Sequence, residues 1–344
     1  MSRRKKILVT GGSGFIAKHI ILQLLNEGFD VRASVRSLDR SAEIVAAMTL
    51  HAKNTEDLDK RLTFCELDLC SDVGWEEALQ NCQALMHTAS PFPLDQPEDE
   101  SELVRPAVDG TLRALTAAHA ASVDRVILTS SVVTICNKRL AAGRNRYDET
   151  DWSDLHSPLN TAYSKSKIQA EKVAWNFVRE HSELKLTTIC PSLVLGPPLD
   201  GNIGSSLGVV ARLMEGRDPM IPNCGIALVD VRDIAQMHVR ALQRPESVGN
   251  RFIGSERFMW MRDVALVLKA EYPDRQIPIR VAPDWLVRLM SMFDQTIKGI
   301  LPSLGLEVHL DNSAAAEVLG IEFIEARQAI RTSASSLVRE NIIS

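Results

Sequence analysis

The sequence lacks the spacings of cysteine and histidine that build a metal centre. Its six cysteines form no Cys-x-x-Cys pair, and its histidines form no cluster at metal-ligand spacing. Several of the cysteines fall inside predicted strands, which favours buried, reduced thiols. We therefore expect no metal site.

The sequence also lacks an excess of positive charge. Lys and Arg number 39 against 44 Asp and Glu, the net charge is -5, and the basic residues are scattered. A protein that binds a phosphate backbone needs a basic stripe. Nucleic acid is therefore not an expected partner.

Long apolar runs are missing as well. A signal-peptide core needs about 7–15 uninterrupted apolar residues, whereas the apolar stretch that begins at Ile7 stops at Gly11. No uncharged run is long enough to cross a bilayer. We expect no membrane span and a cytoplasmic location.

What is present is a regular alternation of short apolar runs with longer amphipathic stretches. The 344 residues, 45% of them apolar, are enough for one large domain or two unequal ones. Strands are predicted at 6–10, 31–35, 62–66, 84–87, 125–129 and 186–190. Helices are predicted at 14–27, 74–80, 99–121 and 161–180. This order is typical of an α/β fold with a doubly wound parallel sheet.

The pattern becomes irregular after Pro191, where glycines and prolines accumulate. We expect a smaller C-terminal substrate-binding lobe there, made of about 194–225 plus 257–344. Residues 1–193 plus about 226–256 would form the dinucleotide-binding domain. Residues 284–301 also show one apolar helical face, which either packs within the protein or a dimer, lies on a membrane, or lines a pocket.

A glycine-rich turn follows the first predicted strand and precedes a helix. Gly12, Gly14 and Ala17 match G-x-G-x-x-G/A, and Gly11, Gly14 and Ala17 match the wider G-x-x-G-x-x-G/A. Such glycines let the backbone approach a pyrophosphate, whose charge is met by the helix N-terminus. At the first βα turn, this pattern predicts a Rossmann fold and a nicotinamide dinucleotide.

Basic residues follow the second predicted strand, where an NAD site has an acidic residue about 20 residues after the glycines. Arg36, Ser37 and Arg40 stand there instead. They can bind a 2′-phosphate through charge-assisted hydrogen bonds. The alternative is an ordinary solvated basic turn. We expect NADPH/NADP+ as the cofactor.

Tyr163 and Lys167 are four residues apart and so lie on one face of a helix. An ammonium about 4–6 Å from a phenol favours the phenolate, so we expect Lys167 to lower the pKa of Tyr163 and make it a useful general acid. The face continues through Ala170 and Ala174, with Glu171 expected elsewhere on the helix. A surface pair is the alternative.

Thr129, Ser130 and Ser131 end the fifth predicted strand, at the carboxyl edge where open α/β sheets bind ligands. A hydroxyl there can donate to a substrate carbonyl oxygen. The residues alone do not separate Ser130 from Ser131.

Taken together, these motifs resemble the extended short-chain dehydrogenase/reductase superfamily. The more specific resemblance is to its dihydroflavonol-reductase-like branch, which includes plant flavonoid reductases and yeast-type aldehyde and methylglyoxal reductases. It rests on His87-Thr88-Ala89-Ser90-Pro91-Phe92, on Pro106-Ala107-Val108-Asp109-Gly110-Thr111, on Pro191-Ser192-Leu193-Val194-Leu195-Gly196-Pro197 and on Val229-Asp230-Val231-Arg232-Asp233. It covers nearly the whole chain.

The resemblance implies roles for residues along the chain. It selects Ser131 as the catalytic serine beside Tyr163 and Lys167. The implied cofactor contacts are Gly11, Gly14, Phe15, Ile16, Arg36, Ser37, Arg40, Asp68, Leu69, Thr88, Ala89, Ser90, Tyr163, Lys167, Pro191, Ser192, Leu193 and Val194. Asp68 and Leu69 would lie by the adenine, and Pro191 and Ser192 by the nicotinamide. The implied substrate contacts are Pro91, Phe92, Ser131, Cys136 and Tyr163.

Three departures bear on the substrate and on proton relay. Plant dihydroflavonol reductases have an Asn five residues after the catalytic serine, whereas this chain has Cys136 there and Asn137 next. The Asn-Trp-Tyr-Cys-Tyr signature of cinnamoyl-CoA reductases is absent around residues 159–164. Arg113 stands where relatives often have Asn, so no proton-relay residue is assigned.

These features predict an NADP-dependent oxidoreductase that reduces a hydrophobic aldehyde or ketone to an alcohol, with Tyr163 as general acid. The expected partner is a small-molecule carbonyl compound, and the expected state is a monomer or homodimer. One alternative is an NAD(P)-dependent sugar-nucleotide epimerase or dehydratase on the same fold. Another is a non-catalytic NADP(H)-sensing regulator.

Overall fold

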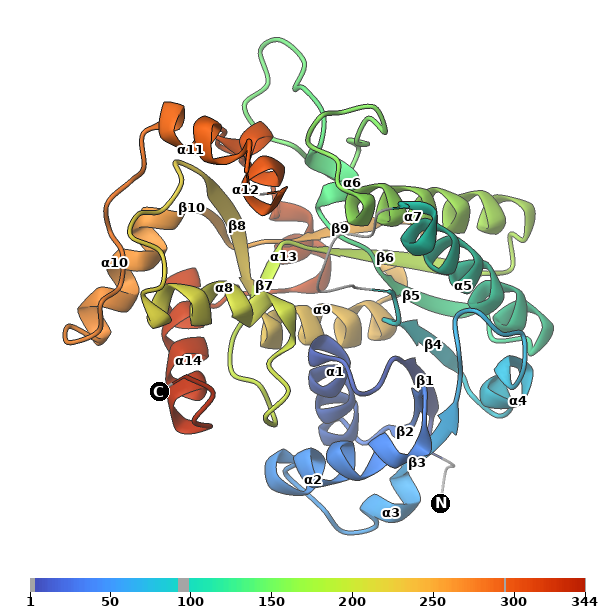
Figure 1. Cartoon of the computed structure of the whole chain (residues 1–344). Coiled ribbons are helices and arrows are strands. Elements are labelled where there is room, and N and C mark those ends of the chain that lie inside the picture. Colours follow the sequence, from blue (N-terminus) through green and yellow to red (C-terminus); the bar gives the residue numbers. More distant parts are fainter. Residues whose placement is uncertain (1–3, 92–98, 294, 344) are drawn as a thin grey trace.

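A seven-stranded sheet forms the centre of the computed structural model, which describes residues 4–91, 99–293 and 295–343 (Figure 1). The strand order is β3-β2-β1-β4-β5-β6-β9, and all neighbouring pairs are parallel. The strands are β1 (Lys6–Thr10), β2 (Asp30–Val35), β3 (Leu62–Glu66), β4 (Ala84–His87), β5 (Arg125–Thr129), β6 (Lys185–Pro191) and β9 (Arg251–Gly254). The predicted Rossmann-type α/β fold is confirmed, with β9 as an edge strand that the sequence analysis did not predict.

Helices cover both faces of this sheet because its strands alternate apolar side chains between the two faces. In β1, Ile7 and Val9 pack in the cluster that includes α1 and α9, whereas Leu8 packs in the cluster with α4, α5 and α7. The helices of the two layers are α1 (Phe15–Asn26), α2 (Ser41–His51), α9 (Val231–Gln243) and α13 (Ser313–Leu319), and α4 (Trp75–Leu79), α5 (Ser101–Ala120) and α7 (Ala162–Glu180). The short helices α3 (Leu58–Arg61) and α6 (Val133–Cys136) lie in connections.

A second, three-stranded sheet of order β10-β8-β7 lies beside the first. Its strands are β7 (Leu193–Leu195), β8 (Gly225–Asp230) and β10 (Arg257–Trp260). They share a buried cluster with α8 (Gly204–Glu215), α10 (Met261–Glu271) and α14 (Ala326–Arg339). The predicted division into a cofactor domain and a substrate lobe stays a prediction.

The segment between β7 and α8 is held against α1, the helix that follows the glycine-rich turn. Lys18 forms ion pairs with Asp200 and with Glu43, and the Nε2 atom of His19 lies 2.9 Å from the carbonyl oxygen of Pro197. The chain leading into α8 therefore stays close to the predicted cofactor turn.

The predicted amphipathic stretch 284–301 forms two short helices, α11 (Asp284–Met290) and α12 (Gln295–Ile300), instead of one. Large apolar side chains on this stretch face solvent, with Trp285 67% and Phe293 85% exposed. Within the described residues, no helix combines the length and the apolar character needed to span a bilayer.

Candidate active site

The glycine-rich turn brings backbone into close contact at the end of β1. Gly11 has φ +65°, and a Cβ there would lie 3.0 Å from Cα of Ala89. A Cβ on Gly12 would lie 2.9 Å from Cβ of Ala33. Gly14 begins α1 without a side-chain cap, which leaves the first amides of the helix available to an anion. This turn fits the pyrophosphate of a dinucleotide.

The ends of β1 and β4 are locked together at the point where the strand order reverses, which is where open α/β sheets bind ligands. The Oγ1 atom of Thr10 accepts the N–H groups of Thr88 and Ala89, both at 3.1 Å, and lies 2.9 Å from Nδ1 of His87. Burial lowers the pKa of His87 to about 3, so its imidazole is neutral. The structure thus places Thr88 and Ala89 beside the glycine turn, followed by Ser90.

The basic turn after β2 presents one free guanidinium. Arg36 is exposed, and nothing in the described parts of the chain bonds to it. Arg40 donates from Nη2 to Glu43 at 2.9 Å. The hydroxyl of Ser37 accepts from the backbone N–H of Asp39 at 3.4 Å, which opens a 3-10 turn. Of the three predicted phosphate ligands, Arg36 is thus the one without a competing partner.

Asp68 and Leu69 follow β3 at the same edge of the sheet. The Asp68 carboxylate accepts the N–H of Cys70 at 2.9 Å, and Leu69 lies against Gly110 of α5. Arg113 donates from Nη1 to the carbonyl oxygen of Leu69 at 2.7 Å. Arg113 thus fixes this turn.

Ser131 and Tyr163 share a side-chain hydrogen bond at the carboxyl end of β5. Thr161 caps α7 by accepting the N–H of Ser164 at 3.2 Å, and this sets the start of the helix just before Tyr163. Lys167 lies one turn further and donates from Nζ to the carbonyl oxygen of Thr129 at 3.3 Å. The structure therefore brings the three predicted catalytic residues together.

The structure separates the two adjacent serines that the sequence could not. The hydroxyl of Ser130 donates to Oε2 of Glu171 at 2.5 Å, in the buried layer between sheet and helix. The hydroxyl of Ser131 is the one that reaches Tyr163. Of the two serines, Ser131 is thus the one that lies beside Tyr163.

The prediction that Lys167 lowers the pKa of Tyr163 is wrong when the protein's own residues alone are considered. Burial raises the pKa of Tyr163 to about 12, and the hydrogen bond from Ser131 only partly opposes this. Burial also lowers the pKa of Lys167 to about 8, although the charge of Glu171 acts to raise it. For both groups, burial, which penalises the charged form, is the largest cause of the change in pKa.

The proposed nicotinamide side of the site contains an unpartnered buried hydroxyl. The N–H of Ser192 donates to the carbonyl oxygen of Gly254 at 2.8 Å, which fixes the chain after β6. Its Oγ atom is buried and has no hydrogen-bond partner among the described residues. Buried polar atoms nearly always have partners, so an orphan marks a place for a ligand. Together with the glycine turn, it fits a bound dinucleotide. Pro191 lies just before Ser192, and Leu193 and Val194 follow it in β7.

The predicted substrate contacts other than Ser131 and Tyr163 differ in how exposed they are. Pro91 is half-buried, and Phe92 lies outside the described residues. Cys136 is buried in a cluster with Ile135 and Tyr147, and burial raises the pKa of its thiol to about 12. It can offer an apolar surface but no thiolate.

The amide of Asn137, the neighbour of Cys136, is already engaged. Its Nδ2 atom donates to Oδ1 of Asn160 at 3.0 Å and to the carbonyl oxygen of Leu159 at 3.4 Å. It does not replace the flavonoid-binding Asn of plant dihydroflavonol reductases.

Sequence reasoning missed a buried ion pair behind these residues. Glu171 of α7 and Arg251 of β9 meet with Nε and Oε1 2.7 Å apart. The expectation that Glu171 lies away from the Tyr163 and Lys167 face is wrong, because Glu171 stands one turn beyond Lys167 and is buried. The spacing of four residues between Lys167 and Glu171 already indicates that both lie on the same face of the helix.

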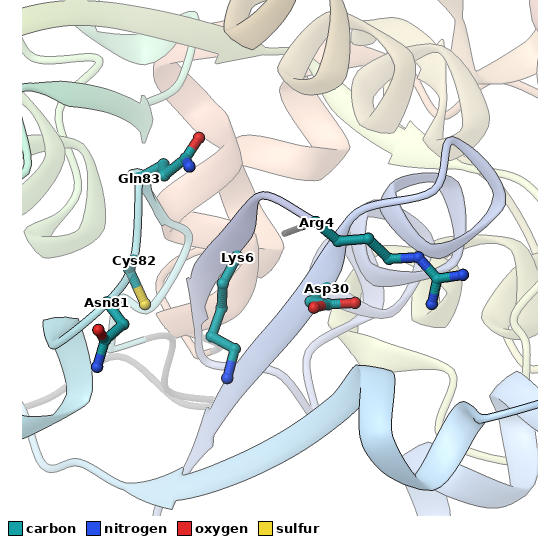
Figure 2. Close-up of a pocket in the computed structure, with 6 residues that line it drawn as sticks. All are labelled: Arg4, Lys6, Asp30, Asn81, Cys82 and Gln83. Carbon is teal, nitrogen blue, oxygen red and sulfur yellow. The ribbon is translucent and has the colours of Figure 1, made fainter. Parts of the chain in front are cut away.

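A separate hollow lies at the opposite, amino-terminal edge of the sheet. It is lined by Arg4, Lys6, Asp30, Asn81, Cys82 and Gln83 (Figure 2). None of the predicted site residues lines it. Among the described residues, no group of three His, Cys, Asp or Glu side chains could hold a metal ion.

Comparison with known proteins identifies the family. The family model for the NAD dependent epimerase/dehydratase family matches residues 7–253. Cinnamoyl-CoA reductase CAD2 of Medicago truncatula is 31% identical over 305 residues, which are 88% of this chain and 90% of that protein. NADPH-dependent methylglyoxal reductase GRE2 of Saccharomyces cerevisiae is 29% identical over 97% of this chain and 98% of its own length.

A solved structure is also similar over nearly the whole chain. The crystal structure of yeast methylglyoxal/isovaleraldehyde reductase Gre2, complexed with NADPH, superposes with a TM-score of 0.80 at 28% identity and covers 98% of this chain and 100% of that one. The resemblance stated from the sequence motifs is thereby confirmed. The chain belongs to the NAD dependent epimerase/dehydratase family, the extended short-chain dehydrogenases/reductases.

Proposed function

We propose that this protein, an NADPH-dependent reductase of the extended short-chain dehydrogenase/reductase family, converts a hydrophobic aldehyde or ketone to the alcohol. The observation that carries the proposal is the hydrogen bond between Ser131 and Tyr163 at the carboxyl edge of the sheet, with Lys167 one turn away. The relatives named as NADPH-dependent methylglyoxal reductase and cinnamoyl-CoA reductase support it.

The chain's own residues supply binding, orientation and a proton. When bound, NADPH supplies a hydride to the carbonyl carbon. Ser131 donates a hydrogen bond to the carbonyl oxygen and orients it towards Tyr163. Tyr163 gives its phenolic proton to the alkoxide that develops, which is a stronger base than the phenolate. Lys167, with a pKa of about 8, is mostly protonated at neutral pH and stabilises the phenolate left on Tyr163.

Cofactor binding follows from three separate places in the chain. The amides at the start of α1 would meet the pyrophosphate. The exposed guanidinium of Arg36, helped by Ser37, would hold the 2′-phosphate. The unpartnered hydroxyl of Ser192 would bond to the nicotinamide.

The apolar packing next to Ser131 supports an apolar substrate. Val132, Ile135 and Cys136 are buried there, with Leu140 and Leu310 packed against them. A pyrophosphate in the substrate would need several fixed cations, because its desolvation is costly. A carbonyl group on an apolar body needs only Ser131 and Tyr163. Since the cinnamoyl-CoA reductase signature is absent, we place aldehydes and ketones ahead of acyl-CoA esters.

The test is NADPH oxidation against a panel of aldehydes, α-dicarbonyls, dihydroflavonols, cinnamoyl-CoA and a UDP-sugar. The variant Tyr163→Phe removes the proton donor and should lower kcat by about 10²- to 10⁴-fold with little change in NADPH affinity. Tyr272→Phe, made outside the site at the end of α10, is the matched control and should keep wild-type kcat. Retention of more than a tenth of kcat by Tyr163→Phe would refute the role of the tyrosine. Preferential epimerisation of the UDP-sugar would make the protein an epimerase.

A further inference from the structure

The ion pair between Glu171 and Arg251 is buried directly behind the candidate active site. The side chains are 1% and 7% exposed, and they come from α7 and from the edge strand β9. A second contact joins Nη2 to Oε2 at 3.3 Å. Burying two charges usually costs more free energy than their attraction returns, so a buried ion pair is weak evidence for a gain in stability. We therefore expect the pair to hold neighbouring groups in a specific arrangement.

All five N–H groups of Arg251 have acceptors. Besides the two contacts with Glu171, Nη1 donates to the carbonyl oxygens of Glu149 and Asp151 at 2.9 and 2.6 Å, and Nη2 donates to Oγ1 of Thr134 at 2.8 Å. The guanidinium also stacks on the ring of Trp152, 3.9 Å from its centroid. The pair therefore holds the segment that leads into α7.

The carboxylate of Glu171 is equally well satisfied. It accepts the hydroxyl of Ser130 at 2.5 Å, the hydroxyl of Thr188 at 3.0 Å and the indole N–H of Trp175 at 3.2 Å. Burial would raise its pKa, but the charge of Arg251 and the hydrogen bonds from Arg251 and Ser130 keep the pKa below its ordinary value. Glu171 is therefore an anion at neutral pH.

The pair reaches Ser131 from both sides. Before it in sequence, Ser130 is bonded to Glu171. After it, Thr134 accepts from Arg251 and donates its own hydroxyl hydrogen to the carbonyl oxygen of Ser131 at 2.8 Å. The position of the Ser131 hydroxyl thus depends on both members of the pair.

The pair also determines the electrostatic surroundings of Lys167. Among the described residues, the titratable groups that act on this lysine are Glu171 of α7, His87 of β4 and Cys190 of β6, with Arg251 of β9 behind Glu171. Tyr163 stands one helical turn before it. At neutral pH His87 and Cys190 are uncharged, since burial takes their pKa values to about 3 and about 12. Glu171 is then the anion that favours the ammonium form of Lys167.

We propose that Glu171 and Arg251 are positioning residues, which fix Ser131 through Ser130 and Thr134 and keep Lys167 protonated. This inference rests on the proposed reductase function for its kinetic consequences. Its electrostatic part can be measured without turnover.

The first experiment compares wild-type protein with Glu171→Gln. Trace acetylation across pH, read by mass spectrometry of the peptide that contains Lys167, gives the pH at which this amine becomes reactive. Removing the anion favours the neutral amine, so the midpoint should fall by about one pH unit or more. The alkaline limb of kcat/KM should move to lower pH with it.

The matched control is Glu180→Gln, an exposed position at the end of the same helix, which should leave the midpoint unchanged. Equal midpoints in wild-type protein and folded Glu171→Gln would overturn the electrostatic part. Because acetylation needs no substrate, a protein that reduces no carbonyl compound would refute the proposed function and leave this measurement valid.

The second experiment tests the link to Ser131 with Thr134→Val, which keeps the size of the side chain and the charge of the site. This variant tests the positioning of Ser131 even if Glu171→Gln does not fold. Loss of the bridge should displace the serine and lower kcat by about 10-fold, with NADPH affinity and the Lys167 midpoint unchanged. Thermal unfolding confirms that the variant is folded. Wild-type kcat in folded Thr134→Val would overturn the positioning of Ser131.

Discussion

Replacing Arg36 with alanine should weaken the binding of NADPH far more than the binding of NADH. Arg36 is exposed and is bonded to no other described residue, so its removal should leave the folded protein intact. A hydrogen bond to a charged group contributes about 1.5–3 kcal/mol, which corresponds to about 10- to 150-fold in affinity. Exposure places the expected loss near the lower end of this range.

The neighbouring ion pair provides an internal comparison. Arg40 is already paired with Glu43 at 2.9 Å, so Arg40→Ala should cost less NADPH affinity than Arg36→Ala. Removal of the competing carboxylate in Glu43→Ala should strengthen NADPH binding. Titrations of each variant with both cofactors, followed by fluorescence or calorimetry at low and high salt, measure these differences. Equal losses for NADPH and NADH in Arg36→Ala would refute the reasoning and make Arg36 a structural residue.

Three further outcomes follow from the site. Turnover should fall as pH rises through about 8, because the proposed mechanism needs protonated Lys167 and burial brings its pKa down to about 8. A pH profile that stays flat up to pH 10 would contradict this. Ser192→Ala should leave stability unchanged or slightly higher, since the hydroxyl is an orphan, while NADPH affinity falls by about 3- to 10-fold; calorimetry and thermal unfolding measure both. Gly11→Ala places a side chain at φ +65° against Ala89. It should lower the free energy of unfolding by at least about 1–2 kcal/mol and weaken NADPH binding. An unfolding free energy equal to that of the wild type, measured by urea titration, would contradict the close contact.

Local patterns were sufficient to predict the centre of the sheet. The six predicted strands agree with the structure to within one residue at each end, because each is an apolar run bounded by turn residues. The strand β9 was not predicted, because Phe252 and Ile253 are its only large apolar residues before Gly254 and so short an apolar run does not stand out. The charge of Arg251 in this strand is neutralised by Glu171, which is far away in the sequence.

The grouping of the candidate site residues could be predicted from the sequence, but their ionisation states could not. The spacing of Tyr163 and Lys167 indicated one helix face, and the end of β5 indicated the serine pair. The ionisation of Tyr163 depends on how deeply both groups are buried, which the sequence does not express, so the predicted direction of its pKa change was wrong. The choice between Ser130 and Ser131 likewise depends on tertiary contacts with Glu171.

The opposite orientations of Ser130 and Ser131 make the chemistry sensitive to strand alignment. Neighbouring residues of an extended chain point to opposite sides, so a slip of one residue would exchange the buried hydroxyl for the reactive one. The alignment is fixed by the pairing of Thr129 with Ile189 and by the N–H of Ser130, which donates to the carbonyl oxygen of Ile189 at 2.7 Å. Insertion or deletion of a single residue near the end of β5 should therefore abolish reduction even where the sheet still forms. Substitutions of single side chains on the strand should instead lower the activity by amounts that differ from residue to residue.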